Sequence, residues 1–253
     1  MIPQRAISAN TLFHFTSNLD NLEGILLNDF YPSYCLEDFS EFLEDEYRIA
    51  IPMVCFCDIP LSQIHNHVKN YGGYALGLSK EWGRKNSISR IIYSYKQSFS
   101  AKYFITTLRY AQDFNSVGIV NQINKLFQFV KPYEGKLYRS NSTTSDLIRF
   151  YDEREWRFVP DTSLRNNVVR SYLSEKEYLD AQELETANGS LANDTFSLSF
   201  EPKDIKYIIV NKESEIHEML KKVIKIKGGK FSYDDVQILT TRIISMEQII
   251  EDF

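Results

Sequence analysis

The predicted fold starts from one charged segment, Asp152-Glu153-Arg154-Glu155-Trp156-Arg157-Phe158-Val159. A β-strand sends alternate side chains to opposite faces. The alternation predicts a late strand with Glu153, Glu155 and Arg157 on one face and Trp156 on the other. Because Trp156 indicates a buried face, we expect the charged face to meet solvent or to line a cleft. The plainer alternative is a surface strand with exposed ion pairs, which contribute roughly 0–1 kcal/mol each.

A second polar strand is predicted near the start of the chain, at Phe13-His14-Phe15-Thr16. His14 and Thr16 share one face, and the two phenylalanines share the other. Thr16, Ser17 or Asn18 can cap the helix that follows. The alternative is a simple strand-to-helix junction in which the His14 side chain only packs against its neighbours and binds no ligand.

Composition predicts a folded protein rather than a disordered chain. The 253 residues are 43% hydrophobic and 14% aromatic, with a net charge of −5. An acidic chain of this kind is not expected to bind nucleic acid over a broad surface. The net charge does not exclude a nucleic acid held in a local basic groove. The absence of a signal-like start or a long apolar run predicts a cytoplasmic protein with no membrane contact. Three cysteines fit reduced thiols.

The order of predicted elements indicates an α+β fold in one domain covering residues 1–253, because strands and helices mix without regular βαβ alternation. Residues 99–130 carry apolar positions at helical spacing, which predicts one or two inserted helices. Residues 131–145 are polar and predict a loop. Further strands are expected at 49–57, 74–78, 88–95, 196–200, 205–210 and 236–244.

Tyr71-Gly72-Gly73-Tyr74 is a candidate ligand-binding segment. Glycines allow a ligand to approach the backbone closely, and either tyrosine could stack on an aromatic ring. A helix stop before a core strand is the plainer interpretation. The chain has neither a Walker-type phosphate loop nor a dinucleotide G-x-G-x-x-G motif.

Cys55-x-Cys57 and His65-x-His67 invite a zinc interpretation, with Cys35 upstream. Structural zinc sites use wider spacings between paired ligands. Two histidines that lie two apart on a helix also point away from each other. We therefore expect no metal site.

Several segments together resemble a known bacterial family. They are Leu12–Thr16 with Asn21–Leu26, then Ala50–Leu61, Tyr71–Gly83 and Glu153–Phe158. In this order they resemble the abortive-infection AbiGi family, which is described as a phage-resistance antitoxin. The resemblance covers most of the chain and implies a role in anti-phage defence.

The same landmarks resemble an ADP-ribosyltransferase-like split β-sheet core with helical insertions, of the kind found in DarT-like toxins. The resemblance implies that NAD is the substrate and that Glu155 is the catalytic residue, with Glu153 as the alternative candidate. The implied NAD-binding residues are His14, Thr16, Asn21, Tyr71, Tyr74 and Arg157. Asn18 could replace Asn21, and Arg48, Arg84 and Arg90 are open choices for the phosphates. The helical region 99–130 has no counterpart there.

Two functions follow from these resemblances. The first is transfer of ADP-ribose from NAD to a macromolecule, with nucleic acid as a candidate acceptor. There the catalytic carboxylate would stabilise the positive charge that develops as nicotinamide leaves. The second is a non-catalytic antitoxin that binds and neutralises a partner toxin. The acidic segment 38–46 and the tail residues Glu247, Glu251 and Asp252 suit the masking of a basic partner.

Overall fold

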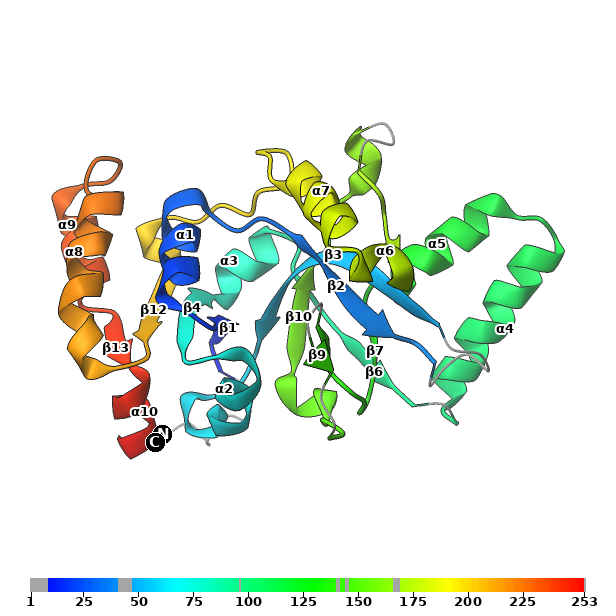
Figure 1. The fold of residues 1–253 in the computed structure, drawn as a ribbon, viewed down its shortest axis with the longest axis horizontal. Coiled ribbons are helices and arrows are strands. Elements are labelled where there is room, and N and C mark those ends of the chain that lie inside the picture. Colours follow the sequence, from blue (N-terminus) through cyan, green and yellow to red (C-terminus); the bar gives the residue numbers. More distant parts are fainter. Residues whose placement is uncertain are drawn as a thin grey trace. The chain divides into compact units, whose positions relative to one another are not determined.

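The computed structural model describes residues 9–40, 47–95, 97–139, 142–143, 146–165 and 169–252 (Figure 1). Contacts group the chain into two compact units. The first contains Met1–Phe30, Cys55–Ile88 and Ser197–Phe253, and the second contains Tyr31–Val54 and Ser89–Phe196. Helices and mixed strands occur in both units, which confirms the α+β class. The single-domain interpretation stays a prediction.

A mixed sheet lies at the centre of the first unit. Strand β1 (Thr11–Thr16) pairs antiparallel with β4 (Tyr74–Ser79), from Thr11 opposite Ser79 to Thr16 opposite Tyr74. Strand β12 (Ile205–Val210) joins the other edge of β4 antiparallel, and β13 (Ile243–Ser245) pairs with β12 in parallel. The last residues of β3 (Arg48–Cys57) lie against β1, with Cys57 opposite Phe13. The central strands β1 and β4 are therefore paired on both sides.

Helices pack around this sheet. Asn18 caps α1 (Leu19–Asn28) and Ser79 caps α3 (Lys80–Lys85), each by accepting a backbone N–H of the first turn. The other helices are α2 (His65–Tyr71), α8 (Ile216–Lys227), α9 (Tyr233–Thr240) and α10 (Met246–Asp252), with 3₁₀ turns at Leu61–Gln63, Pro202–Asp204 and Glu213–Glu215. Phe13, Ile64, Ala75, Ile209 and Ile249 belong to one buried apolar cluster that joins the sheet to α10.

Short strands form the framework of the second unit. Strand β2 (Ser33–Asp38) and β11 (Leu173–Ser174) both pair antiparallel with β3, while β10 (Glu155–Phe158) pairs antiparallel with β5 (Ser89–Arg90). Strands β6 (Ile92–Ser94) and β7 (Val130–Pro132) pair in parallel. Strands β8 (Tyr138–Arg139) and β9 (Ser142–Thr143) form a small hairpin.

The second unit also contains the helical insertion that the sequence predicts. It consists of two helices, α4 (Phe99–Asp113) and α5 (Val117–Phe127), which pack against each other. Figure 1 shows them in green beside β6 and β7. Helices α6 (Glu175–Leu179) and α7 (Ala181–Leu191) pack on β2, and 3₁₀ turns occupy Phe150–Glu153 and Thr162–Arg165.

Two predicted strands are wrong. Residues 236–244 begin inside α9, because Ser232 caps this helix and Val236 and Leu239 are buried at helical spacing. Only Ile243–Ser245 is a strand there. Residues 196–200 form an isolated bridge between Leu198 and Phe30 rather than a strand. β-Branched residues at 236–244 and aromatic residues at 196–200 mimic a strand signal, although tertiary packing decides their conformation.

Candidate functional site

A buried network of charges occupies the interior of the second unit. The side chain of Arg157 on β10 is fully buried, and Glu155 on the same strand is 5% exposed. The Arg157 guanidinium donates hydrogen bonds to the carboxylate of Glu155, to Glu37 on β2 at 2.6 Å, and to the backbone carbonyl of Gln128 at 3.0 Å. The charged face of β10 therefore meets other charges inside the unit, and the expectation that it faces solvent or an open cleft is wrong.

Lys131 on β7 completes the network. Its ammonium group donates to Glu155 at 2.7 Å and to Glu153 at 3.1 Å. It also lies 4.3 Å from the centre of the Phe150 ring. Glu153 belongs to the 3₁₀ turn before β10 rather than to the strand, so its carboxylate reaches the network through Lys131 and not through strand alternation.

Burial and charge act in opposite directions on the carboxylates of this network. Burial alone would raise the pKa of Glu155, but the charges of Arg157 and Lys131 outweigh it and hold that pKa far below its ordinary value. Burial raises the pKa of Glu37, and the same two cations only partly oppose it. Three carboxylates thus share two cations, and Glu37 accepts a proton more readily than Glu155 does.

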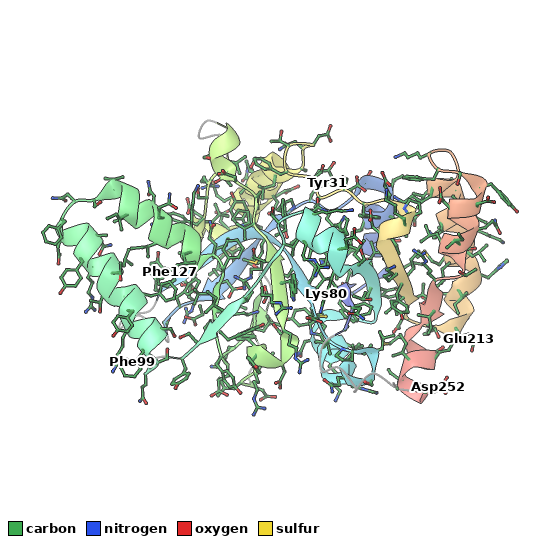
Figure 2. The ribbon with its side chains drawn as sticks, turned by 180° about the vertical axis from the view of Figure 1, so that it is seen from behind. Tyr31, Lys80, Phe99, Phe127, Glu213 and Asp252 are labelled. Carbon is green, nitrogen blue, oxygen red and sulfur yellow. The ribbon has the colours of Figure 1, made fainter. Side chains whose placement is uncertain are left out.

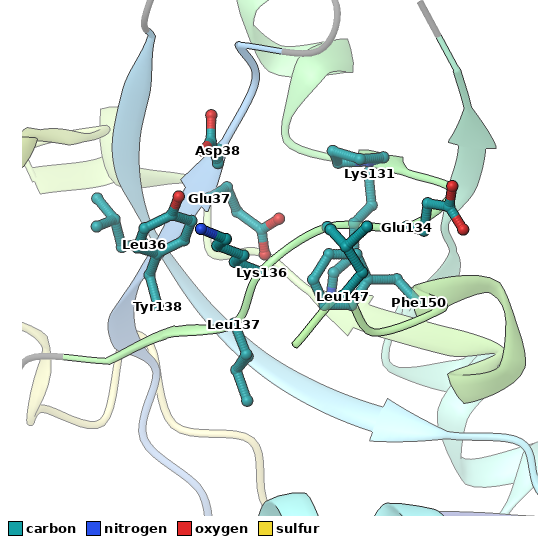
Figure 3. A pocket seen from close by; sticks show the side chains of 12 residues that line it. Leu36, Glu37, Asp38, Lys131, Glu134, Lys136, Leu137, Tyr138, Leu147 and Phe150 are labelled. Atoms are coloured by element: carbon teal, nitrogen blue, oxygen red, sulfur yellow. The ribbon is translucent and has the colours of Figure 1, made fainter. Parts of the chain in front are cut away.

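A pocket of about 200 Å³ borders this network within the second unit. Its lining includes Glu37 and Lys131 from the network, and Lys136, Tyr138 and Phe150 around them. Figure 3 shows the Glu37 and Lys136 side chains directed into the pocket, between Tyr138 and Phe150. Glu155 and Arg157 are not part of the lining, so a ligand in this pocket would meet Glu37 and Lys131 first.

His14 lies in the first unit and takes part in local packing. Its Nδ1–H donates to the backbone carbonyl of Cys55 at 2.8 Å, and its ring meets Phe30 and Phe56 edge to face. Burial lowers the pKa of His14, and the hydrogen bond to Cys55 opposes this only in part. The imidazole is therefore neutral at pH 7.

Thr16 and Asn21 come together at the joint between β1 and α1. The Asn21 side chain donates to the Thr16 hydroxyl at 3.0 Å, and the Asn21 backbone N–H donates to the capping oxygen of Asn18 at 2.8 Å. Thr16 is 8% exposed. These contacts fix the direction in which the helix leaves the strand. Their proposed role in NAD binding stays a prediction.

The two candidate stacking tyrosines of the first unit both have partners. Tyr71 stacks on His67 with ring centres 4.4 Å apart, and the Tyr74 hydroxyl donates to the Glu215 carboxylate at 2.8 Å. Gly72 between them ends α2 at a positive φ of 103°, which favours glycine. The predicted helix stop is therefore confirmed, whereas the role of either tyrosine in ligand binding stays a prediction.

Arginines that are candidates for phosphate binding differ in their surroundings. Arg48 forms ion pairs with Asp38 at 3.1 Å and with Glu175 at 2.9 Å. Arg90 lies 4.8 Å above the Trp156 ring. Arg84 lies in the last turn of α3. Arg48 and Arg90 thus have partners within the second unit, and the choice among the three stays open.

Metal and membrane features complete the description. None of the three cysteines forms a disulfide bond. Within the described ranges, no three His, Cys, Asp or Glu side chains gather as they would around a metal ion. The described helices include none that is both long and apolar enough to cross a bilayer.

Glu37, Lys131 and Tyr93 are network residues that the sequence prediction does not include. The Tyr93 hydroxyl accepts the backbone N–H of Glu155 at 2.8 Å. Lys131 lies in a segment predicted to be a loop. Glu37 directly precedes the acidic segment 38–46, of which residues 41–46 lie outside the described residues. The signal that could have found Lys131 is Val130-Lys131-Pro132, a short extended run directly after a helix.

Comparisons with known proteins agree on one family. Residues 28–211 match the family described as "Putative abortive phage resistance protein AbiGi, antitoxin". A protein of Lactococcus lactis subsp. cremoris named abortive phage resistance protein AbiGi is 26% identical, in an alignment that covers 80% of this chain and 89% of the relative. No solved structure matches. Since the matched segment is well over half of the sequence, the chain belongs to the AbiGi family of abortive phage resistance proteins.

Proposed function

We propose that this protein acts in anti-phage defence as an antitoxin that binds and neutralises a partner toxin. The description of its family names an antitoxin, and the relative from Lactococcus lactis is named for phage resistance. The geometry favours a binding role over a catalytic one. An antitoxin of this kind needs a stable scaffold and a recognition surface, and it needs no reactive group.

The occupied carboxylate of Glu155 is the observation that supports this choice. Arg157 and Lys131 bind one oxygen each, inside a unit where Glu155 is 5% exposed. A carboxylate that stabilises a glycosyl transition state must face the sugar directly. Here the two cations already neutralise the charge, so the network is better suited to holding β10 and β7 together.

Helix α10 offers acidic groups for a basic partner. Glu247, Glu251 and Asp252 are all exposed on it. Opposite charges across an interface speed association and give specificity. We therefore expect the toxin to present Lys and Arg side chains where this helix meets it.

Co-expression with the toxin of the same defence system tests the proposal. The parent protein should restore growth and co-purify with the toxin. Reversing two charges, Glu251→Lys with Asp252→Lys, should weaken the complex by about tenfold or more at low salt. Glu185→Lys on α7 reverses an exposed charge in the second unit and serves as the control. If no complex forms with the parent, or if both variants bind like the parent, this form of antitoxin action is wrong.

ADP-ribose transfer from NAD is the second candidate function. One observation favours it: Glu153, Glu155 and Arg157 do converge in one network, and the pocket beside that network is lined by Glu37 and Lys131. Incubation with NAD labelled in its adenylate, with cell extract as acceptor, tests this function. Label on protein, DNA or RNA that is lost in a folded Glu155→Gln variant would support transfer, whereas unlabelled acceptors would exclude it.

A further inference from the structure

A row of exposed aromatic side chains runs along α4. Phe99, Tyr103 and Tyr110 are 77%, 69% and 61% exposed, and Phe114, directly after the helix, is 80% exposed. The backbone N–H of Phe114 still bonds to the Tyr110 carbonyl, so the helical path continues to this residue. At 3.6 residues per turn the four side chains fall within about 60° of arc. We call them the α4 stripe.

The α4 stripe points away from the contacts that hold the helix in place. Ala101 and Ala111 are buried on other sides of the helix, and the Phe104 ring packs on Phe127 of α5 at 5.5 Å. Figure 2 shows the side chains of this helical pair, with Phe99 at the start of α4 and Phe127 at the end of α5. Four large aromatics in one row on a surface indicate an interaction site.

The spacing of the stripe is symmetric about its own centre. Read from either end, the residues are Phe, Tyr, a central threonine pair, Tyr and Phe. If a second α4 runs antiparallel, with the centre between Thr106 and Thr107, then Phe99 opposes Phe114 and Tyr103 opposes Tyr110. Two-fold symmetric interfaces need such a self-complementary surface. If one residue contacts a second residue across the interface, the same contact must also occur with the two copies exchanged.

Charges beside the stripe are also self-complementary. Lys102 and Asp113 are exposed and lie on the same flank of α4. A two-fold rotation brings equal flanks together, so Lys102 of one copy comes to within about two residues, ~3 Å along the axis, of Asp113 in the other. The symmetric dimer therefore contains this charge pair twice. A partner of unrelated sequence would not require both the aromatic and the charged positions to match in this way.

We propose that α4 is a dimerisation helix and that its occupant is a second copy of this chain, packed antiparallel along the α4 stripe. The proposal does not depend on the antitoxin function. It assigns the inserted helical pair, which the remainder of the second unit leaves largely uncovered, to self-association. The aromatic rings bury each other, and the paired charges select the antiparallel register.

Charge reversal on the full-length protein tests the register. Asp113→Lys places a new cation beside Lys102 of the second copy, so the dissociation constant of the dimer should rise by about tenfold or more. Adding Lys102→Asp in the same chain restores opposite charges and should recover most of the affinity. Sedimentation over a range of protein concentrations measures both changes. A parent protein that stays monomeric at all concentrations, or a double variant no tighter than Asp113→Lys, would overturn the proposal.

Substitutions of exposed tyrosines test the α4 stripe and provide a matched control. Tyr103→Ser with Tyr110→Ser removes the centre of the stripe and should abolish the dimer, while circular dichroism should show an unchanged fold. Tyr233→Ser, at a 76% exposed tyrosine on α9 of the first unit, should leave dimerisation unchanged. If the parent is monomeric and the stripe variant instead loses binding to the toxin, the stripe is a toxin-binding surface and the dimer proposal is wrong.

Discussion

Arg157 on β10 links this strand to β2 and to the end of α5 through one hydrogen bond from each of its three side-chain nitrogens, although no part of its side chain reaches solvent. A guanidinium can remain charged in such a place only where carboxylates and carbonyls satisfy it. Glu155 and Glu37 supply this compensation from two different strands. The network therefore ties β10 to β2, and its members depend on one another for their charge states.

Replacing Arg157 by alanine should destabilise the protein strongly. The change leaves Glu37 and Glu155 buried with one fewer cation, and breaking a buried pair costs about 3–5 kcal/mol. Arg149→Ala is the control, because Arg149 is largely exposed and its 3.8 Å contact with Asp152 lies at the surface. That change should alter the free energy of unfolding by less than about 1 kcal/mol. Urea unfolding measures both, and equal effects would show that the network carries no special share of the stability.

Acid should weaken the protein through Glu155. Its pKa is lowered in the folded state, so its ion pairs contribute stability that is complete above the unfolded pKa of about 4.3 and is lost as pH falls below it. Glu155→Gln should lower stability at pH 7 and flatten its dependence on pH between about pH 4.3 and pH 2. Glu37 acts in the opposite sense, since its raised pKa gives stability that is lost as pH rises. Unfolding curves at several pH values measure this dependence. A variant with the acid slope of the parent would contradict it.

The strand β10 shows which features of single residues could be predicted from the sequence and which could not. Trp156 correctly predicted a buried face of β10, because a large aromatic side chain that alternates with charged residues is seldom left in solvent. Glu155 and Arg157 were correctly placed on the other face of this strand. Their burial was not predictable, since the cation that compensates Glu155 from outside the strand is Lys131, 24 residues earlier, and only the pairing of β6 with β7 brings it there.

At the scale of elements, two glycines should respond oppositely to alanine. Gly24 lies inside α1 with no atom within 4 Å of an added Cβ, so Gly24→Ala should stabilise the protein by about 0.5–1 kcal/mol. Gly72 has a positive φ, and its Cβ would collide with the backbone of Thr16 and Ser17. Gly72→Ala should destabilise by about 1–3 kcal/mol. Thermal unfolding of both variants tests the helix stop, and a stabilised Gly72→Ala would refute it.

Elements were predictable where a cap or a glycine accompanied the periodic pattern. Asn18 caps α1 and Gly72 ends α2, and both features lie where the sequence placed them. The pair α4 and α5 was expected from its helical spacing alone. The prediction is wrong at α9, although its cap, Ser232, follows a turn that contains two glycines. Local propensity cannot distinguish a short buried helix from a strand when both need the same apolar residues.

At the scale of the whole molecule, the sequence predicted the family better than the mechanism. The order of the motifs pointed to AbiGi, and the family match over residues 28–211 confirms this. The NAD-binding set divides between the two units: His14, Thr16, Asn21 and the two tyrosines belong to the first, and Glu153, Glu155 and Arg157 belong to the second. Motif order along a chain does not report which charges will neutralise one another inside it. That information comes only from tertiary contacts.

Ligand-linked stability distinguishes the two proposed functions for the intact protein. A ligand that binds only the folded state raises its stability by RT ln(1 + [L]/Kd), about 2.7 kcal/mol at a hundred times Kd. As an antitoxin, the protein should show an unchanged midpoint of thermal unfolding with millimolar NAD and a raised midpoint with its purified toxin. Adenosine diphosphate at equal concentration controls for weak phosphate binding. A midpoint that rises with NAD, but rises less for a folded Glu155→Gln variant, would favour the transferase, because the added stability would then depend on the carboxylate beside Arg157 and Lys131.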